Sequence, residues 1–477
     1  MVKFPRSSGI LLHPTSLPGA NGIGELGNEA LAFVDFLKSA GQTVWQVLPL
    51  GPTGYGDSPY QCFSAFAGNP LLISTDRLLE NGYLTRSDLA NRPPFPAERV
   101  DYGWVIDWKL PLLARAAERF FDSGKERVAF SSFMKKHGWW LDEYARFMAD
   151  KQPFPEDAQR YWQFEFFRQW CDLKNYANAR GIRIMGDLPI YVAGDSAEVK
   201  NNPELFQVNS HGRPLFVAGV PPDYFSATGQ LWGNPIYRWD VMRAQGYQWW
   251  VARFRHTMEL FDFMRLDHFR GFEAYWQVPA TEKTAINGEW VKGPGAELFA
   301  AVERELGPLP IVAENLGVIT DEVEAIRRQF GYPGMSVLQF AFGTDPQAPT
   351  FRPHNYPREV VAYTGTHDND TTVGWWNSTA NADSTRSEAD IEGEREFTRA
   401  YLRTDGREIN WTFVETIMAS VADTVLIPLQ DVLGLGSEAR MNLPGRGEGN
   451  WHWRFETGAL KPQQAARLKQ LAALYDR

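Results

Sequence analysis

Eight short β-rich runs, most of them ending in polar residues or glycine, recur along this sequence. They cover residues 9–16, 43–51, 181–189, 263–271, 309–317, 334–343, 360–370 and 423–434. Segments with helical periodicity lie between most of them, at 28–40 (with Asn28 as the expected N-cap), 157–180, 241–261 and 295–306. This alternation predicts an α/β fold, and eight such strands predict a (β/α)8 TIM barrel. A doubly wound open sheet is the alternative, but no GxGxxG motif follows the first strand.

Two connections are too long for simple crossovers between neighbouring strands. Residues 52–180 contain several helical patterns and predict a mainly helical insertion subdomain between strands 2 and 3. Residues 191–257 predict a loop-rich insertion between strands 3 and 4 that crosses the C-terminal face of the barrel, because much of this segment is rich in Gly, Pro, Asn and aromatic residues. Residues 435–477 predict a further loop and a last helix. We therefore expect residues 1–477 to form one catalytic barrel with these additions.

Composition argues against several classes of partner. The net charge is -10 and the sequence pI is about 5.5, whereas nucleic acids and anionic membranes recruit Lys and Arg. Cys62 and Cys171 are too few for a disulfide framework or a cysteine-based zinc site. No apolar run of about 18 residues is present, and the first residues form no apolar signal segment. We expect a cytoplasmic protein, a monomer or a weak homo-oligomer, with no nucleic-acid or membrane partner.

Four carboxylates follow apolar β-rich stretches, at the C-terminal ends of predicted strands, where the active sites of such barrels lie. They are Asp187, Asp267, Glu314 and Asp368, and histidines 268 and 367 adjoin two of them. One acid at a strand end usually caps a loop or forms an ion pair, but four in matching contexts favour a functional site. A divalent metal is the alternative use, although HExxH and DxDxDG motifs are absent. Paired acids suit glycoside chemistry, and loops rich in aromatic residues suit sugar rings.

Longer stretches of the sequence resemble one known family in the same order. They are 51–61 (GPTGYGDSPYQ), 186–199, 219–237, 265–276 (RLDHFRGFEAYW), 313–317 (AENLG), 365–371 (GTHDNDT) and 440–445 (RMNLPG). The sequence is similar to the amylomaltase family of 4-α-glucanotransferases, which is related to the α-amylase superfamily. The resemblance implies a retaining enzyme that transfers α-1,4-glucan segments between maltooligosaccharides or starch- and glycogen-type chains through a covalent glucosyl-Asp intermediate. It implies glucose or maltooligosaccharide acceptors, no cofactor and no metal, and it leaves open whether cyclic glucans form.

The resemblance also implies roles for the catalytic residues. Asp267 matches the nucleophile, Glu314 the general acid/base and Asp368 the stabiliser of the transition state. Arg265 lies two residues before Asp267 on the predicted strand and therefore points to the same side, where its guanidinium would keep Asp267 ionised. A structural ion pair is the alternative explanation for Arg265.

Further residues are expected to bind the sugar. Tyr60 matches an aromatic platform, with Ser58 in the same DSPY stretch, and Asp187 and His367 match residues that hold the donor sugar. The other candidates are His268, the loop residues Tyr224, Phe225, Gln230, Trp232 and Asn234, and Asn442 in the tail loop. Without the resemblance, Tyr60 and His268 are better explained as core or satisfied strand-end residues.

The motifs leave the fate of the intermediate undetermined. A sugar acceptor makes the enzyme a transferase and water makes it an amylase-like hydrolase, because the same carboxylates serve both reactions. A catalytically silent glucan-binding barrel is a third hypothesis, disfavoured because all three catalytic acids are present. Lys200 departs from the family pattern, which has an aromatic residue there, and no Asn-His pair follows Asp187, so no obligatory calcium is inferred.

Overall fold

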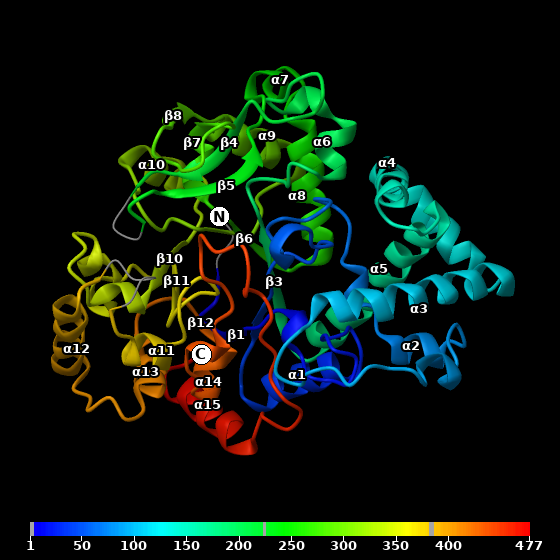
Figure 1. The fold of residues 1–477 in the computed structure, drawn as a ribbon. Coiled ribbons are helices and arrows are strands. Elements are labelled where there is room, and N and C mark those ends of the chain that lie inside the picture. The colour runs from blue at the N-terminus through cyan, green and yellow to red at the C-terminus, as the bar shows by residue number, and fades with distance from the viewer. Residues whose placement is uncertain (1–3, 223–225, 381–385) are drawn as a thin grey trace.

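A ring of eight parallel strands lies at the centre of the computed structural model, which describes residues 4–222, 226–380 and 386–477 (Figure 1). The hydrogen-bonded order of neighbours is β10-β11-β12-β1-β2-β3-β6-β9. Each strand overlaps one of the eight β-rich runs, and β1 begins two residues before its run, so the predicted (β/α)8 barrel is confirmed. The strands are β1 (Ser7–Leu11), β2 (Val44–Gln46), β3 (Arg183–Leu188), β6 (Phe263–Leu266), β9 (Ile311–Ala313), β10 (Gly334–Val337), β11 (Val360–Tyr363) and β12 (Thr424–Pro428).

Side chains alternate between the inside of the barrel and the surrounding helices. In β3, Met185 belongs to the inner cluster, whereas Ile184 packs in the layer between strands and helices. In β6, Phe263 points inward and Met264 outward. Both faces of each strand are buried, which is why the strands read as continuous apolar runs in the sequence.

The barrel is closed between β9 and β10 by one backbone hydrogen bond and one side chain rather than by a regular ladder. The Ala313 amide donates to the Pro333 carbonyl at 2.9 Å, and the Met335 amide donates to Asn315 Oδ1 at 2.8 Å. A Cβ on Gly334 would lie 2.7 Å from Asn315 Oδ1, so the strand can approach the amide only with glycine at this position.

Most of the expected helices are present, with two corrections. The helix α1 (Asn28–Ser39) begins at Asn28, and Gly27 is the N-cap, so the prediction of Asn28 as the cap was wrong. The segment 241–261 contains two helices, α7 (Trp239–Ala244) and α8 (Gln248–Leu260). Gly246 (φ 65°) and Tyr247 (φ 59°) adopt the left-handed conformation between them, which ends one helix and starts another.

One barrel connection lacks an α-helix. Between β10 and β11 the chain forms only 3-10 turns, at Leu338–Ala341, Ala348–Phe351 and Pro353–Asn355. Four prolines in this connection, at positions 346, 349, 353 and 357, explain the absence, because proline removes a backbone donor and restricts the residue before it.

Helices α2 to α5 follow β2, and α3 and α4 project to the right of the barrel in Figure 1. They are α2 (Thr75–Glu80), α3 (Tyr102–Ser123), α4 (Arg127–Lys151) and α5 (Glu156–Ala179). A buried ion pair joins this group to the N-terminal part, because Lys109 on α3 pairs with Glu25 and also donates to the Leu71 carbonyl at 2.7 Å. The carboxylate compensates the cost of burying the ammonium group.

A second, antiparallel sheet covers another side of the barrel, at the top of Figure 1. Its order is β5-β4-β7-β8, and its strands come from two separate connections, those after β3 and after β6. The sequence suggested only loops for much of this region. The strands are β4 (Phe216–Val220), β5 (Gln230–Pro235), β7 (Ala274–Pro279) and β8 (Glu289–Lys292).

The remaining helices complete the outer layer. They are α6 (Ala197–Asn201), α9 (Ala296–Leu306), α10 (Asp321–Gln329), α11 (Thr372–Asn377), α12 (Glu388–Leu402), α13 (Ile409–Ala419), α14 (Leu429–Leu433) and α15 (Pro462–Leu474), which packs beside α1. None of the helices in the described part of the chain is both long enough and apolar enough to cross a membrane.

Candidate active site

Arg265 is the centre of a buried charge network at the C-terminal end of β3 and β6. Its Nη1 donates to both Asp187 oxygens, at 2.9 and 2.8 Å, and lies 2.9 Å from Asp267 Oδ1. The Tyr60 hydroxyl donates to Asp187 Oδ2 at 2.8 Å. Burial raises the pKa of Asp267, Arg265 opposes this change and Asp368 adds to it. One guanidinium therefore holds two carboxylates in place and favours their ionised forms.

Glu314 lies directly after β9 in a different environment. It forms no ion pair among the described residues, and its carboxyl accepts hydrogen bonds from the His268 amide at 2.8 Å and the Leu316 amide at 2.9 Å. Burial raises the pKa of Glu314 to about 7, with Arg265 opposing the change and Asp267 adding to it. A carboxyl of this kind is protonated for much of the time near neutral pH and suits a general acid.

Asp368 lies on the loop after β11 and is held from the tail loop. Asn442 Nδ2 donates to Asp368 Oδ1 at 2.7 Å, and Arg440 Nη2 donates to the Asp368 carbonyl at 2.7 Å. His367 Nε2 lies 3.4 Å from Asp368 Oδ1, and burial lowers the pKa of His367 to about 4. The imidazole is therefore neutral near pH 7 and can donate or accept a hydrogen bond without carrying charge.

Aromatic side chains form one wall of the site. The rings of Tyr60 and His367 stack at 5.3 Å with an interplanar angle of 11°, and Trp451 lies 5.9 Å from each of them. The Ser58 hydroxyl accepts a hydrogen bond from the Tyr60 amide at 3.2 Å, which fixes the turn that presents the ring. Such a wall offers flat apolar surface to a sugar, with hydroxyl and imidazole groups at its edge.

The β4–β5 hairpin contributes a second group beside His268. The Trp232 ring meets the His268 ring edge to face at 4.8 Å, and Gln230 Oε1 accepts from Trp232 Nε1 at 3.1 Å. Asn234 Nδ2 donates to the Val192 carbonyl at 2.8 Å, and Gln61 Nε2 donates to Asn234 Oδ1 at 3.1 Å. His268 adopts φ 46°, and burial lowers its pKa to about 3. Asn234 therefore has a structural partner on each side, and the Trp232 side chain is only partly buried beside His268.

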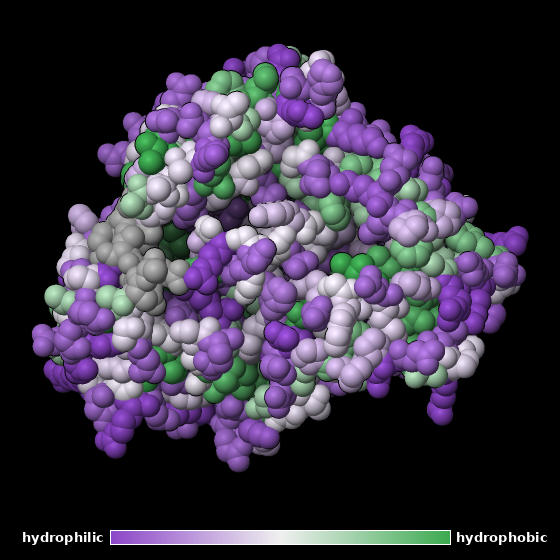
Figure 2. All heavy atoms as spheres, viewed as in Figure 1, coloured by the Kyte–Doolittle hydropathy of each residue, from purple (hydrophilic) through white to green (hydrophobic). Residues whose placement is uncertain are grey.

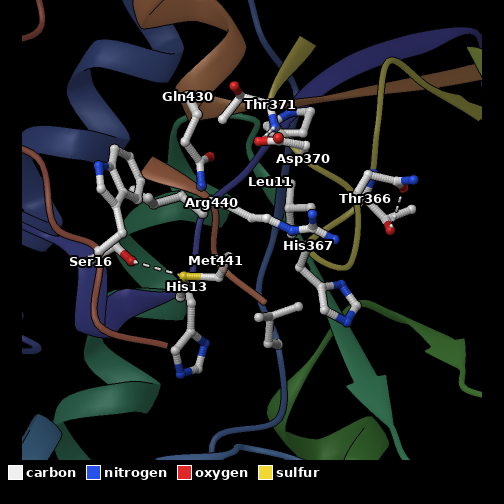
Figure 3. Close-up of a pocket in the computed structure, with 15 residues that line it drawn as sticks. Leu11, His13, Ser16, Thr366, His367, Asp370, Thr371, Gln430, Arg440 and Met441 are labelled. Carbon is white, nitrogen blue, oxygen red and sulfur yellow. Dashed lines mark hydrogen bonds between the residues drawn. The ribbon is translucent and has the colours of Figure 1, made fainter. Parts of the chain in front are cut away.

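The surface is hollowed near the middle of the face that Figure 2 shows. Beside the loop after β11, a cavity is lined by His13, His367, Asp370, Arg440 and Met441, among others (Figure 3). Burial lowers the pKa of His13 to about 3, so this cavity adds no positive imidazole to the site near neutral pH.

One group of side chains outside the site has a donor set suited to a cation. His137, His256 and Glu259 place one potential ligand atom each within 4.8 Å of one another. Lys136 already pairs with Glu259 at 2.8 Å, and His256 Nε2 is bound to the Phe66 carbonyl oxygen at 2.7 Å. A metal would have to displace Lys136, so we assign no ion to this group.

Comparisons with known proteins identify the family. The 4-alpha-glucanotransferase family matches residues 12–162 and 155–460 of this chain. The 4-alpha-glucanotransferase of Thermus thermophilus is 50% identical over 515 aligned residues, covering 100% of both chains, and that of Synechocystis is 48% identical, covering 99% of this chain and 98% of its own. The chain belongs to the 4-alpha-glucanotransferase family.

Solved structures agree with this glucanotransferase assignment. The amylomaltase from Streptococcus agalactiae in complex with acarbose superimposes with a TM-score of 0.93 at 38% identity, covering 99% of each chain. The amylomaltase from Corynebacterium glutamicum has a TM-score of 0.81 at 19% identity, covers 99% of this chain and 75% of its own, and supports the fold. The expected family, enzyme class and fold of this glucanotransferase are confirmed.

The structure brings most of the predicted site residues of the glucanotransferase together. The four acids, Arg265, both histidines, Tyr60 and Asn442 form one connected set at the C-terminal ends of the strands, with Ser58, Gln230, Trp232 and Asn234 next to it. Tyr224 and Phe225 lie outside the described residues. Lys200 lies on α6 and pairs with Asp150 at 2.8 Å.

Sequence reasoning missed Trp451, Arg440 and Gln61. Arg440 lies within the RMNLPG stretch, which was a signal for it, whereas Trp451 follows that stretch without a local pattern that marks it. Gln61 is the last residue of the GPTGYGDSPYQ stretch, and this position was the signal for it.

Proposed function

We propose that this enzyme is a retaining 4-α-glucanotransferase that moves α-1,4-glucan segments between maltooligosaccharides or starch- and glycogen-type chains. The observation that carries the proposal is the contrast between two acids that follow neighbouring strands. Asp267 is bound by the guanidinium of Arg265 at 2.9 Å, whereas Glu314 accepts only backbone N–H bonds among the described residues. One acid is thereby favoured as an anion and the other as a proton donor, which is the pairing that retaining glycoside chemistry needs.

The first step cleaves the donor glucan. An Asp267 carboxylate oxygen attacks the anomeric carbon, and the bond from that carbon to the glycosidic oxygen breaks. Glu314 donates its proton to this oxygen, so the departing glucan leaves as an alcohol. The products are a glucosyl ester on Asp267 and an ionised Glu314.

The second step transfers the glucosyl segment to an acceptor. The ionised Glu314 takes the proton from the 4-hydroxyl of an incoming sugar, whose oxygen attacks the anomeric carbon and releases Asp267 as a carboxylate. Two inversions at the same carbon give net retention. Glu314 is protonated again, so the enzyme is ready for another donor.

The surrounding side chains hold the donor sugar. Asp368 and His367, fixed from the tail loop through Asn442, are placed to bind hydroxyl groups and favour a distorted ring. Tyr60 offers its ring face, and Asp187 is held by Arg265 beside it. His268 contributes its ring next to Trp232.

The choice between transfer and hydrolysis depends on the β4–β5 hairpin. Trp232 stands beside His268 and offers a stacking surface to acceptor sugars, with Gln230 and Asn234 nearby. Tyr224 and Phe225, which lie outside the described residues, are proposed to bind acceptor sugars as well. A sugar stacked there excludes water from the ester. The amylase-like hydrolase is the competing function.

Purified protein and maltotriose, without added metal, distinguish these functions. We expect a constant number of reducing ends while glucose and longer chains appear, because transfer conserves glycosidic bonds. A rise in reducing ends with only shorter chains would assign the enzyme to the hydrolases. No change in either quantity would contradict both and favour a glucan-binding barrel. Analysis of a long amylose substrate for cyclic products tests whether cyclic glucans form.

We further propose a cytoplasmic enzyme that works without a cofactor as a monomer or weak homo-oligomer, with neither nucleic acid nor membrane as a partner. The net charge of -10 supports the absence of polyanionic partners. The insertions 52–180 and 191–257 and the tail 435–477 are proposed to frame the cleft of a single catalytic unit. Light scattering after size exclusion tests the oligomeric state.

A further inference from the structure

Arg270 is a buried cation that has no role in the proposed reaction. It is 7% exposed, and among the described residues no carboxylate lies within ion-pair distance of it. Glu273, whose charge acts on Arg270 through space, is paired with Lys292 instead. Burying a guanidinium without a carboxylate partner is costly, so its two actual contacts need an explanation.

The first contact of Arg270 is with the loop that carries Glu314. Arg270 Nη1 donates to the carbonyl of Val318, four residues after Glu314 and on the same connection between β9 and α10. The two residues before Arg270 bind the same loop, since the His268 amide donates to Glu314 Oε2 at 2.8 Å and the Phe269 amide donates to the Glu314 carbonyl at 3.1 Å. Three consecutive residues after Asp267, at positions 268 to 270, therefore each bind the loop after β9 that carries Glu314.

The second contact of Arg270 is with Trp290 on β8. The guanidinium carbon lies 3.7 Å from the centre of the Trp290 ring, which is a close cation–π distance. Trp290 is paired in register with Trp276 on β7, and their rings lie 5.3 Å apart. The Lys292–Glu273 pair fixes the same strand to the segment after Arg270. The stacked arginine is therefore one of the links between the second sheet and the catalytic loops, beside the Lys292–Glu273 pair.

We propose that Trp290 is a positioning residue for the acid/base Glu314, acting through Arg270 and the Val318 carbonyl. Trp290 holds the guanidinium plane, the guanidinium holds the loop 314–318, and the loop keeps the Glu314 carboxyl on its two backbone amides and away from water. This inference rests on the proposed function, because it takes Glu314 to be the group that gives and takes the proton.

The environment of Glu314 makes this positioning measurable. The groups that face Glu314 are Arg265 and Asp267, with the neutral imidazole of His268 beside them. Burial is the main cause of the raised pKa of Glu314. A loosened loop admits water, which lowers that pKa, so the protonated acid is lost at a lower pH and the basic limb of the activity profile moves to lower pH.

The test compares pH profiles of kcat/KM for maltotriose disproportionation between about pH 5 and about pH 9 in folded variants. Trp290→Leu keeps an apolar side chain without a π face, and Trp290→Phe keeps a face. In the leucine variant we expect the basic limb to move to lower pH by about half to one pH unit, which lowers kcat/KM about three- to tenfold at pH values above the limb. In the phenylalanine variant we expect the limb to return to its wild-type position. Trp139→Leu, which changes a 52% exposed tryptophan on α4, is the matched control and should leave the limb in place.

An unchanged limb in Trp290→Leu, an equal shift in Trp290→Phe or an equal shift in the control would overturn the inference. Arg270→Lys keeps the charge but not the planar group, and we expect it to reproduce the shift of the leucine variant. A basic limb at its wild-type pH in Arg270→Lys would also contradict the proposed role of Trp290 and Arg270. Failure of the proposed function looks different. In that case Glu314→Gln would keep wild-type turnover and the same limb.

Discussion

Asp267 and Glu314 show how two identical functional groups acquire opposite tasks from their neighbours. Each lies one residue beyond its strand, and each is largely buried, so burial alone raises the pKa of both. The difference comes from Arg265, which binds Asp267 directly and Glu314 only at longer range. Arg265 occupies the strand position that faces the same side as Asp267, and this pairing was readable from the sequence.

Replacing Asp267 by alanine removes the oxygen that attacks the anomeric carbon. We expect turnover of maltotriose to fall below detection while binding of a maltooligosaccharide persists, because the aromatic wall and Asp368 remain. Chain-length analysis and calorimetric titration measure the two properties. Near-normal turnover in a homogeneous preparation would remove Asp267 from the nucleophile role.

The pH dependence of turnover should report Glu314. Glu314 must start protonated, and its pKa is raised to about 7, so activity should fall as the pH rises through about 7. Glu314→Gln should lower turnover by about 10²–10⁴-fold and abolish this basic limb, because the amide cannot exchange a proton. A basic limb that survives in the glutamine variant would belong to another group.

Residues that come from distant parts of the chain were harder to predict. Trp451 and Arg440 reach the site from the tail loop, where no local pattern distinguishes a tryptophan that lies beside Tyr60 from one that fills the core. Their placement depends on tertiary packing of the tail across the barrel. The acids were predictable because strand ends of a barrel converge by geometry alone.

Among the elements, the second sheet was the least predictable. Its central pair joins β4 to β7, from two different connections, so its register depends on contacts that no local segment contains. Gly219 and Gly233 weaken the β pattern in β4 and β5, and Gly233 adopts φ 79°. The barrel strands, by contrast, are buried on both faces and read as uninterrupted apolar runs.

The β4–β5 hairpin should control the partition between sugar and water. Trp232→Ala removes the ring that stands beside His268 and leaves a gap through which water reaches the ester. We expect the ratio of hydrolysis to transfer to rise severalfold, measured as new reducing ends per transferred segment. Trp139→Ala provides the comparison, since the same rise in that variant would mean a general effect of losing a tryptophan.

Shortening Asn315 should weaken the closure of the barrel between β9 and β10. Asn315→Ala leaves the Met335 amide without its acceptor, so we expect the free energy of unfolding to fall by about 1–3 kcal/mol. Urea titration followed by circular dichroism measures this loss. Asn287→Ala, which removes an exposed amide bonded to Glu282, should change the free energy of unfolding much less. Equal losses in the two variants would contradict a special role of Asn315 in closing the barrel.

At the scale of the molecule, the helical group after β2 is attached through charge as well as apolar packing. Lys109 is fully buried against Glu25, so Lys109→Met leaves a buried carboxylate unpaired. We expect a loss of about 3–5 kcal/mol in the free energy of unfolding, with partial recovery in the double variant Lys109→Met/Glu25→Gln. No recovery would mean that the packing of Lys109, rather than its charge, matters. The exposed Arg238–Asp240 pair is the reference, and Arg238→Ala should cost little.

The pairing of β1 with β12 has a consequence for biosynthesis. Ser7 is in register with Thr424, so β1 cannot pair with β12, one of its two neighbours, until residues 424–428 have left the ribosome. Until then the nascent chain carries an unpaired strand edge, and such edges are prone to intermolecular association. Closure across so long a loop is slow. Chains that terminate early, before β12, are therefore expected to depend on chaperones or to aggregate, even though most of the catalytic residues have already been made.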